Sequence, residues 1–127
     1  MMIIGLGTDI VEVSRVSEVR QRHDGAFERK VFTMAERTKG LEKKKGADHF
    51  FAGRWAAKEA IVKALGTGFG PECGWQDIEI LNDDRGRPIL TLSGDGASFA
   101  NSLGIKVWHI TISHEKHYAS AVAIAEG

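Results

Sequence analysis

A carboxylate and an ammonium group stand four residues apart in the stretch AGRWAAKEAIVKALGTG, residues 52–68. At 100° per residue, Glu59 and Lys63 share one face of a helix with Ala52 and Ala56. Small side chains on that face let a second backbone or a ligand approach closely. The charged pair is therefore a candidate for phosphate or proton-transfer chemistry. The alternative is an ordinary solvated ion pair, which stabilises a helix by about 0.2–0.5 kcal/mol.

A glycine-rich run follows this helix directly. Gly66 has the position of a residue that ends a helix, and Gly66-Thr67-Gly68-Phe69-Gly70 then offers backbone amides with few side chains in the way. Such a turn can hold a phosphate. Because the run follows the helix, the helix dipole opposes an anion there, and Lys63 has to supply the positive charge. The glycine pattern alone is a weak signal.

Asp9 is a third candidate. Residues 2–6 are an apolar run typical of a short buried strand that ends at Gly7. Asp9 then lies where a strand exit leaves a carboxylate at the edge of a sheet, and its alternative role is that of a turn or cap residue. Gly5-x-Gly7 is too short for a dinucleotide-binding fingerprint, because no third glycine opens a following helix.

Both helices and strands are expected to position these residues. Helical patterns cover residues 14–23, 33–42, 51–65 and 94–103, and strand patterns cover 76–81, 89–92, 105–113 and 118–125. Thr33 and Glu36 have the spacing of a capping box, and a turn is expected at Asp24-Gly25 within residues 24–30. The basic run 43–45 is interpreted as a solvated loop or a phosphate contact. The strands pair as two hairpins, so an antiparallel sheet is expected.

His114 lies at the tip of the second hairpin, where an imidazole is well placed to contact a ligand. A nucleophilic pair with Ser113 is rejected. Neighbours along a strand point to opposite faces, and no Gly-x-Ser-x-Gly sequence occurs.

Composition limits the function classes. The chain has 127 residues, 43% of them hydrophobic, which predicts one domain over residues 1–127. No apolar run reaches the ~20 residues of a membrane span, and the N-terminus lacks a signal-peptide pattern, so we expect a soluble cytoplasmic protein without a membrane partner. The single cysteine, Cys73, fits a reducing compartment and forms no internal disulfide.

The charge distribution indicates the kind of partner. Net charge is zero, but residues 1–63 carry 13 Lys/Arg against 9 Asp/Glu, and residues 64–127 carry 4 against 8. This argues against nucleic acid as a partner and allows a local basic patch that faces an acidic protein. Arg15 and Arg22 lie two turns apart on one face of the first helix, which is either a solvated surface or such a patch.

Four segments together resemble the holo-acyl-carrier-protein synthase family: GLGTDIVEVSRV, FAGRWAAKEAIVKALGTG, QDIEI and TISHE, in this order. The resemblance covers nearly the whole chain. It implies an α+β fold with an antiparallel sheet packed on a long central helix, and a homotrimer with active sites between subunits. It also implies magnesium-dependent transfer of 4′-phosphopantetheine from coenzyme A to a serine of acyl carrier protein, with release of 3′,5′-ADP.

The resemblance also assigns expected roles to individual residues. Asp9 and Glu59 match the magnesium carboxylates, and Lys63 matches the lysine that contacts the transferred phosphate. Coenzyme A contacts are expected from Arg54, Lys63, Gly66, Thr67 and His114, with Lys45 near the ribose 3′-phosphate, and Arg15 and Arg22 match the residues that dock the acidic carrier helix. Glu59 or a water molecule on the metal takes the serine proton.

Other function classes remain as alternatives. A non-catalytic module that binds coenzyme A or a nucleotide needs the basic and glycine residues but not both carboxylates, and a trimeric interaction protein needs neither. A transferase that serves polyketide or peptide carriers is a further alternative. The presence of both Asp9 and Glu59 favours the enzyme.

Overall fold

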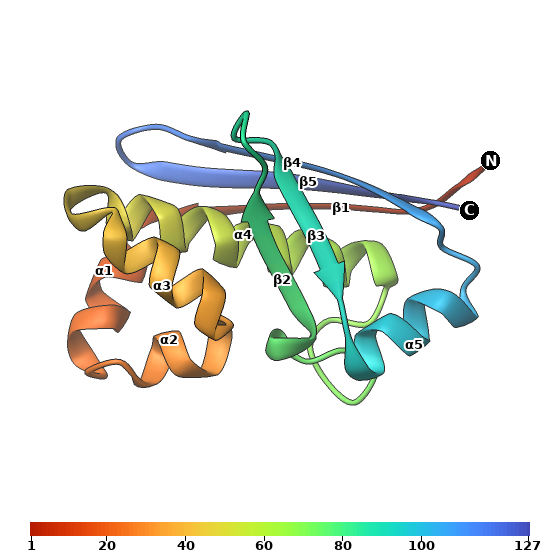
Figure 1. The fold of residues 1–127 in the computed structure, drawn as a ribbon, viewed down its shortest axis with the longest axis horizontal. Helices are drawn as coiled ribbons and strands as arrows, with labels where there is room; N and C mark the ends of the chain where they lie inside the picture. The colour runs from red at the N-terminus through yellow and green to blue at the C-terminus, as the bar shows by residue number, and fades with distance from the viewer.

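Helix α4 (Ala47–Leu65) crosses the whole molecule, and the other elements pack around it (Figure 1). The computed structural model describes all residues 1–127. The elements are β1 (Ile3–Glu12), α1 (Val13–Arg22), α2 (Ala26–Val31), α3 (Met34–Glu42), α4, β2 (Ile78–Asn82), β3 (Pro88–Leu92), α5 (Gly94–Ser102), β4 (Val107–His114) and β5 (Tyr118–Glu126). The predicted α+β class, with antiparallel sheets and a long central helix, is confirmed.

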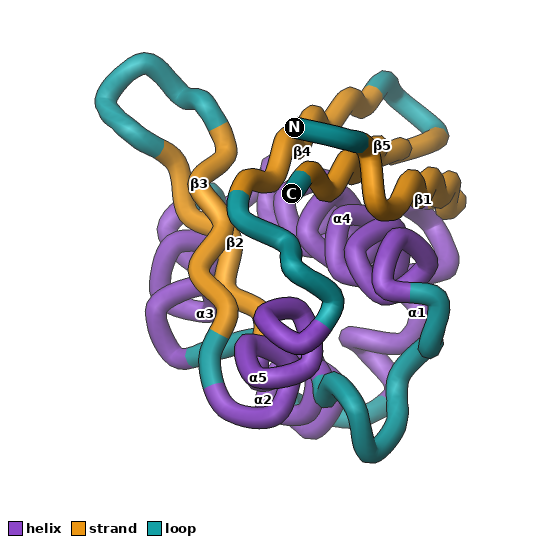
Figure 2. Tube along the Cα trace, turned by 90° about the vertical axis from the view of Figure 1, so that its right-hand side faces the viewer, coloured by secondary structure: helices purple, strands orange, loops and turns teal.

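The larger sheet has the strand order β1-β5-β4 and packs one face on α4. In Figure 2 it lies on one side of α4, and no helix covers its other face. Alternate residues of β5 point to the helix, and all four of them are buried alanines: Ala119, Ala121, Ala123 and Ala125. Small side chains on the strand and on the helix bring the two layers close together.

Two glycines of β1 explain why α4 carries an alanine-rich face. A Cβ atom at Gly7 would lie 1.8 Å from the carbonyl oxygen of Ala60, and one at Gly5 would lie 2.0 Å from that of Ala64. The backbone of β1 therefore rests directly on the helix, and only glycine fits there. The small-residue face of α4 was expected to admit either a second backbone or a ligand. At Ala60 and Ala64 it is occupied by the backbone of β1.

The prediction that the first strand ends at Gly7 is wrong. Strand β1 continues to Glu12, and Asp9 lies within it, paired with Ala121 of β5. The glycines that suggested a turn instead serve helix packing. Pairing with β5 thus holds the backbone of Asp9. Gly7 and Val11, two residues before and after it, are both buried, so the alternation of side chains along the strand directs Asp9 to the same face, toward α4.

Most of the other predicted elements are present. The capping box of α3 is complete, since Thr33 accepts from the Glu36 amide and Glu36 accepts from the Thr33 amide. Both hairpins form, with Gly86 at the tip of the first at φ 85°. The turn expected at Asp24-Gly25 is present, with both residues at positive φ, and residues 26–31 form the unpredicted helix α2. No helix combines the length and hydropathy needed to cross a bilayer.

Candidate active site

Strand β1 and helix α4 bring Asp9, Glu59 and Lys63 together. The Lys63 ammonium donates to Asp9 Oδ1 at 3.0 Å and to the Thr8 carbonyl oxygen at 3.0 Å. The ion pair of Lys63 is thus with Asp9 and not, as the helical spacing suggested, with Glu59. Asp9 is only 12% exposed whereas Lys63 is 51% exposed, so the cation lies at the mouth of the group and the carboxylate lies inside it.

The negative charge of Asp9 perturbs the neighbouring carboxylate, Glu59. Burial raises the pKa of Glu59 above its ordinary value of 4.5, the negative charge of Asp9 raises it further, and Lys63 partly opposes both effects. The second carboxylate oxygen of Asp9, Oδ2, is buried and has no hydrogen-bond partner. An unpaired buried carboxylate oxygen beside a second acid is a place where added positive charge is strongly favoured.

Asp9 and Glu59 fit the preferences of a magnesium ion. Magnesium takes oxygen ligands and is commonly held by one or two carboxylates together with water and substrate phosphates. The structure contains no cluster of three or more Asp, Glu, His or Cys side chains that could enclose a metal by themselves. A metal at this position therefore needs further oxygen atoms from water or a phosphate ligand. Asp9 Oδ2 has no partner and could bind it while Lys63 keeps Oδ1.

The glycine-rich run after α4 is not the open amide cradle that its sequence suggests. The amides of Gly66 and Thr67 donate to Lys63 and Val62 carbonyl oxygens, and the Gly68 amide also donates to Val62. Gly66 is left-handed at φ 80°, as a helix-ending residue requires. These bonds satisfy the last carbonyls of α4, so most amides of the run are already used. An anion here depends on side chains, with Lys63 foremost.

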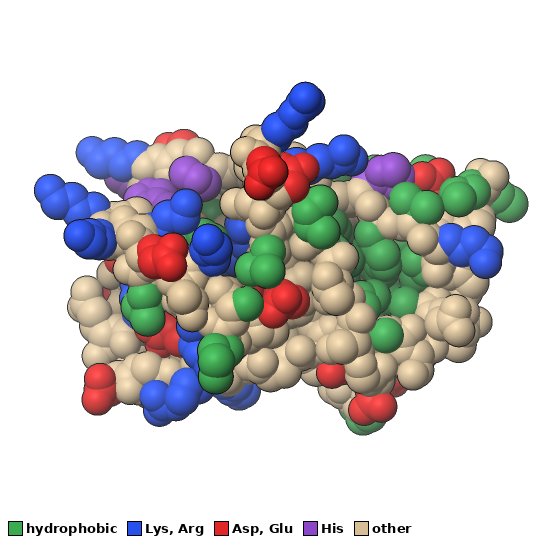
Figure 3. All heavy atoms as spheres, viewed as in Figure 1, with side chains coloured by type: hydrophobic (Ala, Val, Ile, Leu, Met, Phe, Trp, Pro, Cys, Tyr) green, Lys and Arg blue, Asp and Glu red, His purple; other side chains and the backbone are tan.

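A second feature is a cavity of about 500 Å³ beside the first half of α4. Its lining includes both Arg54 and His114, and mixes basic, aromatic and amide side chains: Lys43, Gly46, His49, Phe50, Gly53, Arg54, Asn82, Ile112, His114 and Glu115. Lys45 lies in the same turn as Lys43 but is not part of the lining. In Figure 3, Lys, Arg and His side chains gather at the end of the molecule where α3 and the start of α4 lie.

Arg54 is fixed in this cavity by strand β2. Its Nε donates to the Ile80 carbonyl oxygen at 2.9 Å and its Nη2 donates to Asn82 Oδ1 at 3.0 Å. The guanidinium carbon also lies 4.4 Å from the centre of the Phe50 ring. Burial lowers the pKa of Arg54 and the charge of Glu36 raises it, but an arginine still keeps its charge at neutral pH. A buried guanidinium with free N–H groups suits a phosphate.

The carboxylate group and the cavity are not brought together within one chain. Glu59 and Arg54 are separated by about 140° around the axis of α4. Gly66 and Thr67 lie at the far end of the helix, about 18 Å along its axis from Arg54. Of the residues expected to contact one ligand, Lys63 contacts Asp9, and Gly66 and Thr67 follow it at the end of α4. Arg54 and His114 line the cavity on another face.

Helix α1 carries the two arginines expected to meet a partner. Arg15 and Arg22 are exposed and make no ion pair, whereas Arg20 between them bonds to Glu28 and Asp48. Arg15 also lines a small apolar cavity of about 110 Å³ together with Val11, Val16, Val19, Phe27 and Trp55.

Sequence reasoning missed the buried pair of Lys58 and Glu36, whose side chains are 0% exposed. At 100° per residue, Lys58 falls in the middle of the apolar stripe that contains Phe51 and Val62, and a lysine in that position requires a buried partner. The capping box gave Glu36 a sufficient structural role, so its second contact, with Lys58, was not looked for. His49 and Asn82 had no signal of their own, because only the fold brings them to the cavity.

Known proteins resemble this chain along its whole length. The sequence profile of the 4′-phosphopantetheinyl transferase superfamily matches residues 5–123. The holo-[acyl-carrier-protein] synthases of Hydrogenovibrio crunogenus and Aliivibrio salmonicida are 43% and 46% identical to it, over 98% and 99% of both chains.

Solved structures agree with the sequence relatives. The holo-[acyl-carrier-protein] synthase of Neisseria meningitidis has a TM-score of 0.92 at 30% identity, and covers 99% of this chain and 100% of its own. The enzyme of Bacillus anthracis in complex with CoA (3′,5′-ADP) has a TM-score of 0.82 at 38% identity, over 98% and 97% of the two chains. By its profile, its relatives and its fold, the chain belongs to the 4′-phosphopantetheinyl transferase superfamily.

Proposed function

We propose that this chain is a magnesium-dependent holo-[acyl-carrier-protein] synthase of the cytoplasm, which transfers 4′-phosphopantetheine from coenzyme A to a serine of acyl carrier protein. The names of its full-length relatives and the coenzyme A complexes of two structural neighbours support this assignment. The observation that carries it is the grouping of Asp9, Glu59 and Lys63 around one buried, unpaired carboxylate oxygen. Residues 1–127 act as one transferase domain.

The reaction breaks the phosphoanhydride bond of coenzyme A and forms a phosphodiester with the serine. The serine oxygen forms a bond to the phosphorus that bears pantetheine, the bond from that phosphorus to the bridging oxygen breaks, and 3′,5′-ADP leaves with the electron pair. Lys63, half exposed at the mouth of the group, neutralises charge on the oxygens of the transferred phosphoryl group. Asp9 and Glu59 would hold magnesium, which would supply positive charge to the pyrophosphate. Glu59 or a water molecule accepts the serine proton.

The cavity beside α4 accommodates the adenosine phosphate end of coenzyme A. Arg54 offers a fixed, charged fork to a phosphate, and His114, His49 and Lys43 add donors around it. Lys45, exposed in the adjoining turn, reaches the outer side of the same phosphate. Thr67 and Gly66 lie beside the other end of the coenzyme A molecule, next to Lys63. The volume of about 500 Å³ is of the size that small-molecule sites have.

A homotrimer with active sites between subunits reconciles the two separate groups. One extended coenzyme A molecule can meet both if the carboxylate group of one subunit faces the cavity of its neighbour. The bare face of the larger sheet supports self-association, because it exposes Leu6 at 63% and Ile10 at 66%, beside Val122 and Ile124 of β5. Contiguous apolar surface of this kind is typical of subunit interfaces.

The carrier protein docks on helix α1. Arg15 and Arg22 have no acidic partner within the chain and are free to pair with carboxylates of an acidic helix. The apolar cavity beside Arg15 offers a place for one hydrophobic side chain of the carrier.

Mass spectrometry of an apo acyl carrier protein, incubated with the enzyme, coenzyme A and magnesium, tests the proposal. The carrier is expected to gain one phosphopantetheine group, and 3′,5′-ADP is expected in equal amount. The Glu59→Gln variant serves as the matched control, since it keeps the shape of the side chain and removes its charge. A protein that binds coenzyme A tightly but leaves the carrier mass unchanged would be a non-catalytic binding module instead.

A further inference from the structure

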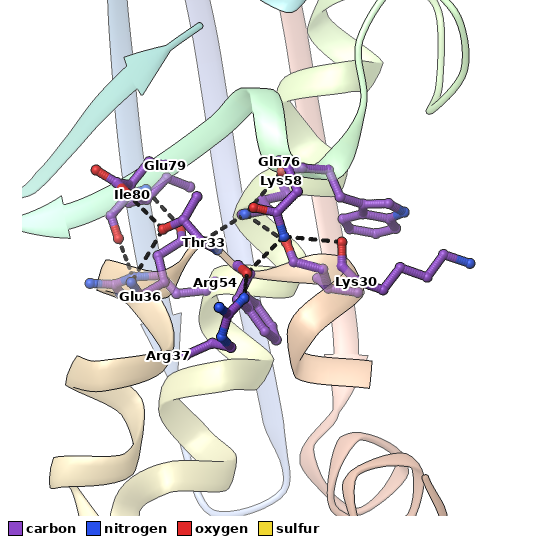
Figure 4. A network of polar contacts seen from close by, with 12 residues as sticks. Lys30, Thr33, Glu36, Arg37, Arg54, Lys58, Gln76, Glu79 and Ile80 are labelled. Atoms are coloured by element: carbon purple, nitrogen blue, oxygen red, sulfur yellow. Dashed lines mark hydrogen bonds and ion pairs between the residues drawn. The ribbon is translucent and has the colours of Figure 1, made fainter. Parts of the chain in front are cut away.

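A buried ion pair lies behind the cavity and belongs to neither part of the proposed site. Lys58 Nζ lies 2.7 Å from Glu36 Oε1, and both side chains are fully buried. Figure 4 shows this pair between α3, α4 and β2, within a continuous network of polar contacts. Replacing a buried pair by apolar side chains is often neutral or stabilising, so stability alone is a weak reason to keep one.

The polar atoms of the pair are fully used. Lys58 Nζ also donates to the Val31 carbonyl oxygen at 2.7 Å and to that of Trp75 at 3.1 Å, which completes its three donors. Glu36 Oε1 accepts from the Thr33 amide, and Oε2 accepts from the Ile80 amide, each at 2.8 Å. Glu36 therefore connects the start of α3 to the middle of β2, with a charge that Lys58 balances.

Ile80 connects this pair to the cavity. Its amide donates to Glu36, and its carbonyl oxygen accepts from Arg54 Nε. Asn82, two residues further along β2, takes the second bond from Arg54. Any shift of β2 relative to α3 therefore moves both oxygen atoms that hold the guanidinium.

We propose that Glu36, held in place by Lys58, is a positioning residue for coenzyme A binding that acts through Ile80 to set the guanidinium of Arg54. This inference rests on the proposed function, because it takes Arg54 as a ligand contact. Glu36 itself touches neither the cavity nor the carboxylate group. Its effect is therefore expected on ligand affinity and not on the rate of the chemical step.

The test is a double-mutant cycle read by calorimetric binding of 3′,5′-ADP. Glu36→Gln keeps the size of the side chain but leaves one of the two backbone amides without an acceptor. We expect it to weaken binding about tenfold. Arg54→Ala is expected to weaken binding at least as much, and adding Glu36→Gln to Arg54→Ala is expected to cause no further loss. In carrier modification assays, KM for coenzyme A rises and kcat stays close to that of the parent.

Glu28→Gln is the matched control. Glu28 is also a largely buried carboxylate in an ion pair, with Arg20, but it lies on α2 away from β2 and the cavity. Its removal is expected to lower the melting temperature and to leave 3′,5′-ADP affinity unchanged. If Glu36→Gln does not fold, the charge-neutral double variant Glu36→Gln with Lys58→Met, which leaves no unpaired buried charge, enters the cycle in its place.

The outcomes separate the positioning role from the proposed function. Unchanged affinity in Glu36→Gln, or losses that add fully with those of Arg54→Ala, would overturn the positioning role and leave the transferase proposal intact. A parent protein that binds neither coenzyme A nor 3′,5′-ADP would overturn both.

Discussion

At the scale of single residues, Lys63 has two competing functions. In the described structure its ammonium holds Asp9 Oδ1 and the Thr8 carbonyl oxygen. In the proposed reaction it would turn to the phosphoryl oxygens, and a magnesium ion held by Asp9 and Glu59 would supply the positive charge beside Asp9. With half of its side chain exposed, the lysine has room for that change.

Replacing Lys63 by alanine is expected to lower kcat by about 10²–10³, with a smaller change in KM for coenzyme A, because its charge acts where negative charge moves in the transition state. Lys63→Arg is not expected to rescue fully, since a planar guanidinium differs from a compact ammonium. Steady-state kinetics with coenzyme A varied measures both constants. A raised KM with kcat intact would make Lys63 only a ground-state phosphate clamp.

Cys73 is expected to be an inert thiol. It is fully buried, and burial followed by the charge of Asp77 raises its pKa from 9.0 to about 11. Stability from the neutral thiol is fully present below pH 9 and is lost as pH rises through about 11. At pH 8 an aromatic disulfide reagent should therefore label the native protein far more slowly than the urea-unfolded protein. Labelling at equal rates would contradict the described burial.

At the scale of elements, the contact between β1 and α4 positions Asp9 against Glu59 and Lys63. A Cβ atom at Gly7 would lie 1.8 Å from a backbone oxygen of α4, and backbone atoms move away less easily than side chains. Any residue larger than glycine there separates the strand from the helix two residues before Asp9.

The Gly7→Ala substitution is therefore expected to destabilise the protein by at least ~1–3 kcal/mol and to reduce transfer activity more than an equal loss of stability elsewhere does. Urea unfolding and the carrier assay measure the two effects. Gly70→Ala is the matched control, since a Cβ there meets nothing closer than 3.7 Å and its φ is not left-handed. Equal stability of the two variants would show that β1 does not rest on α4 as described.

The exposed arginines of helix α1 lead to a separate prediction about binding of the carrier protein. The double variant Arg15→Glu with Arg22→Glu is expected to raise KM for the carrier at least tenfold and to leave coenzyme A affinity nearly unchanged. Its KM for the carrier should also depend less on salt, because the attraction that salt screens has been removed; the Debye length is about 8 Å at physiological ionic strength. Kinetics with each substrate varied at two salt concentrations measures this. An equal loss for both substrates would indicate a folding defect instead.

Much of this element arrangement could be predicted from the sequence, because hairpins and capping boxes are local patterns. The extent of β1 could not, since Gly5 and Gly7 look like turn residues until α4 is known to lie against them. The same holds for the site. The spacing of Glu59 and Lys63 identified the charged group, but the partner of Lys63 comes from a strand 54 residues away. Long-range contacts of this kind leave no local pattern.

At the scale of the whole molecule, the carboxylate group and the cavity lie on different sides of α4. If the carboxylate group of one subunit works with the cavity of its neighbour, no single subunit holds a complete site. A site made from two chains can then be rebuilt from two different defective chains.

Co-expression of Glu59→Gln and Arg54→Ala chains with different tags tests this arrangement. Each variant alone is expected to be nearly inactive. In every mixed trimer purified through both tags, one of the three sites combines an intact carboxylate group with an intact cavity, so activity should rise clearly above either variant. The matched control mixes Glu59→Gln with Asp9→Asn, which damage the same group in every chain and should give no gain. Equal activities of the two mixtures would mean that each subunit carries its own site, and that coenzyme A reaches both groups around α4 within one chain.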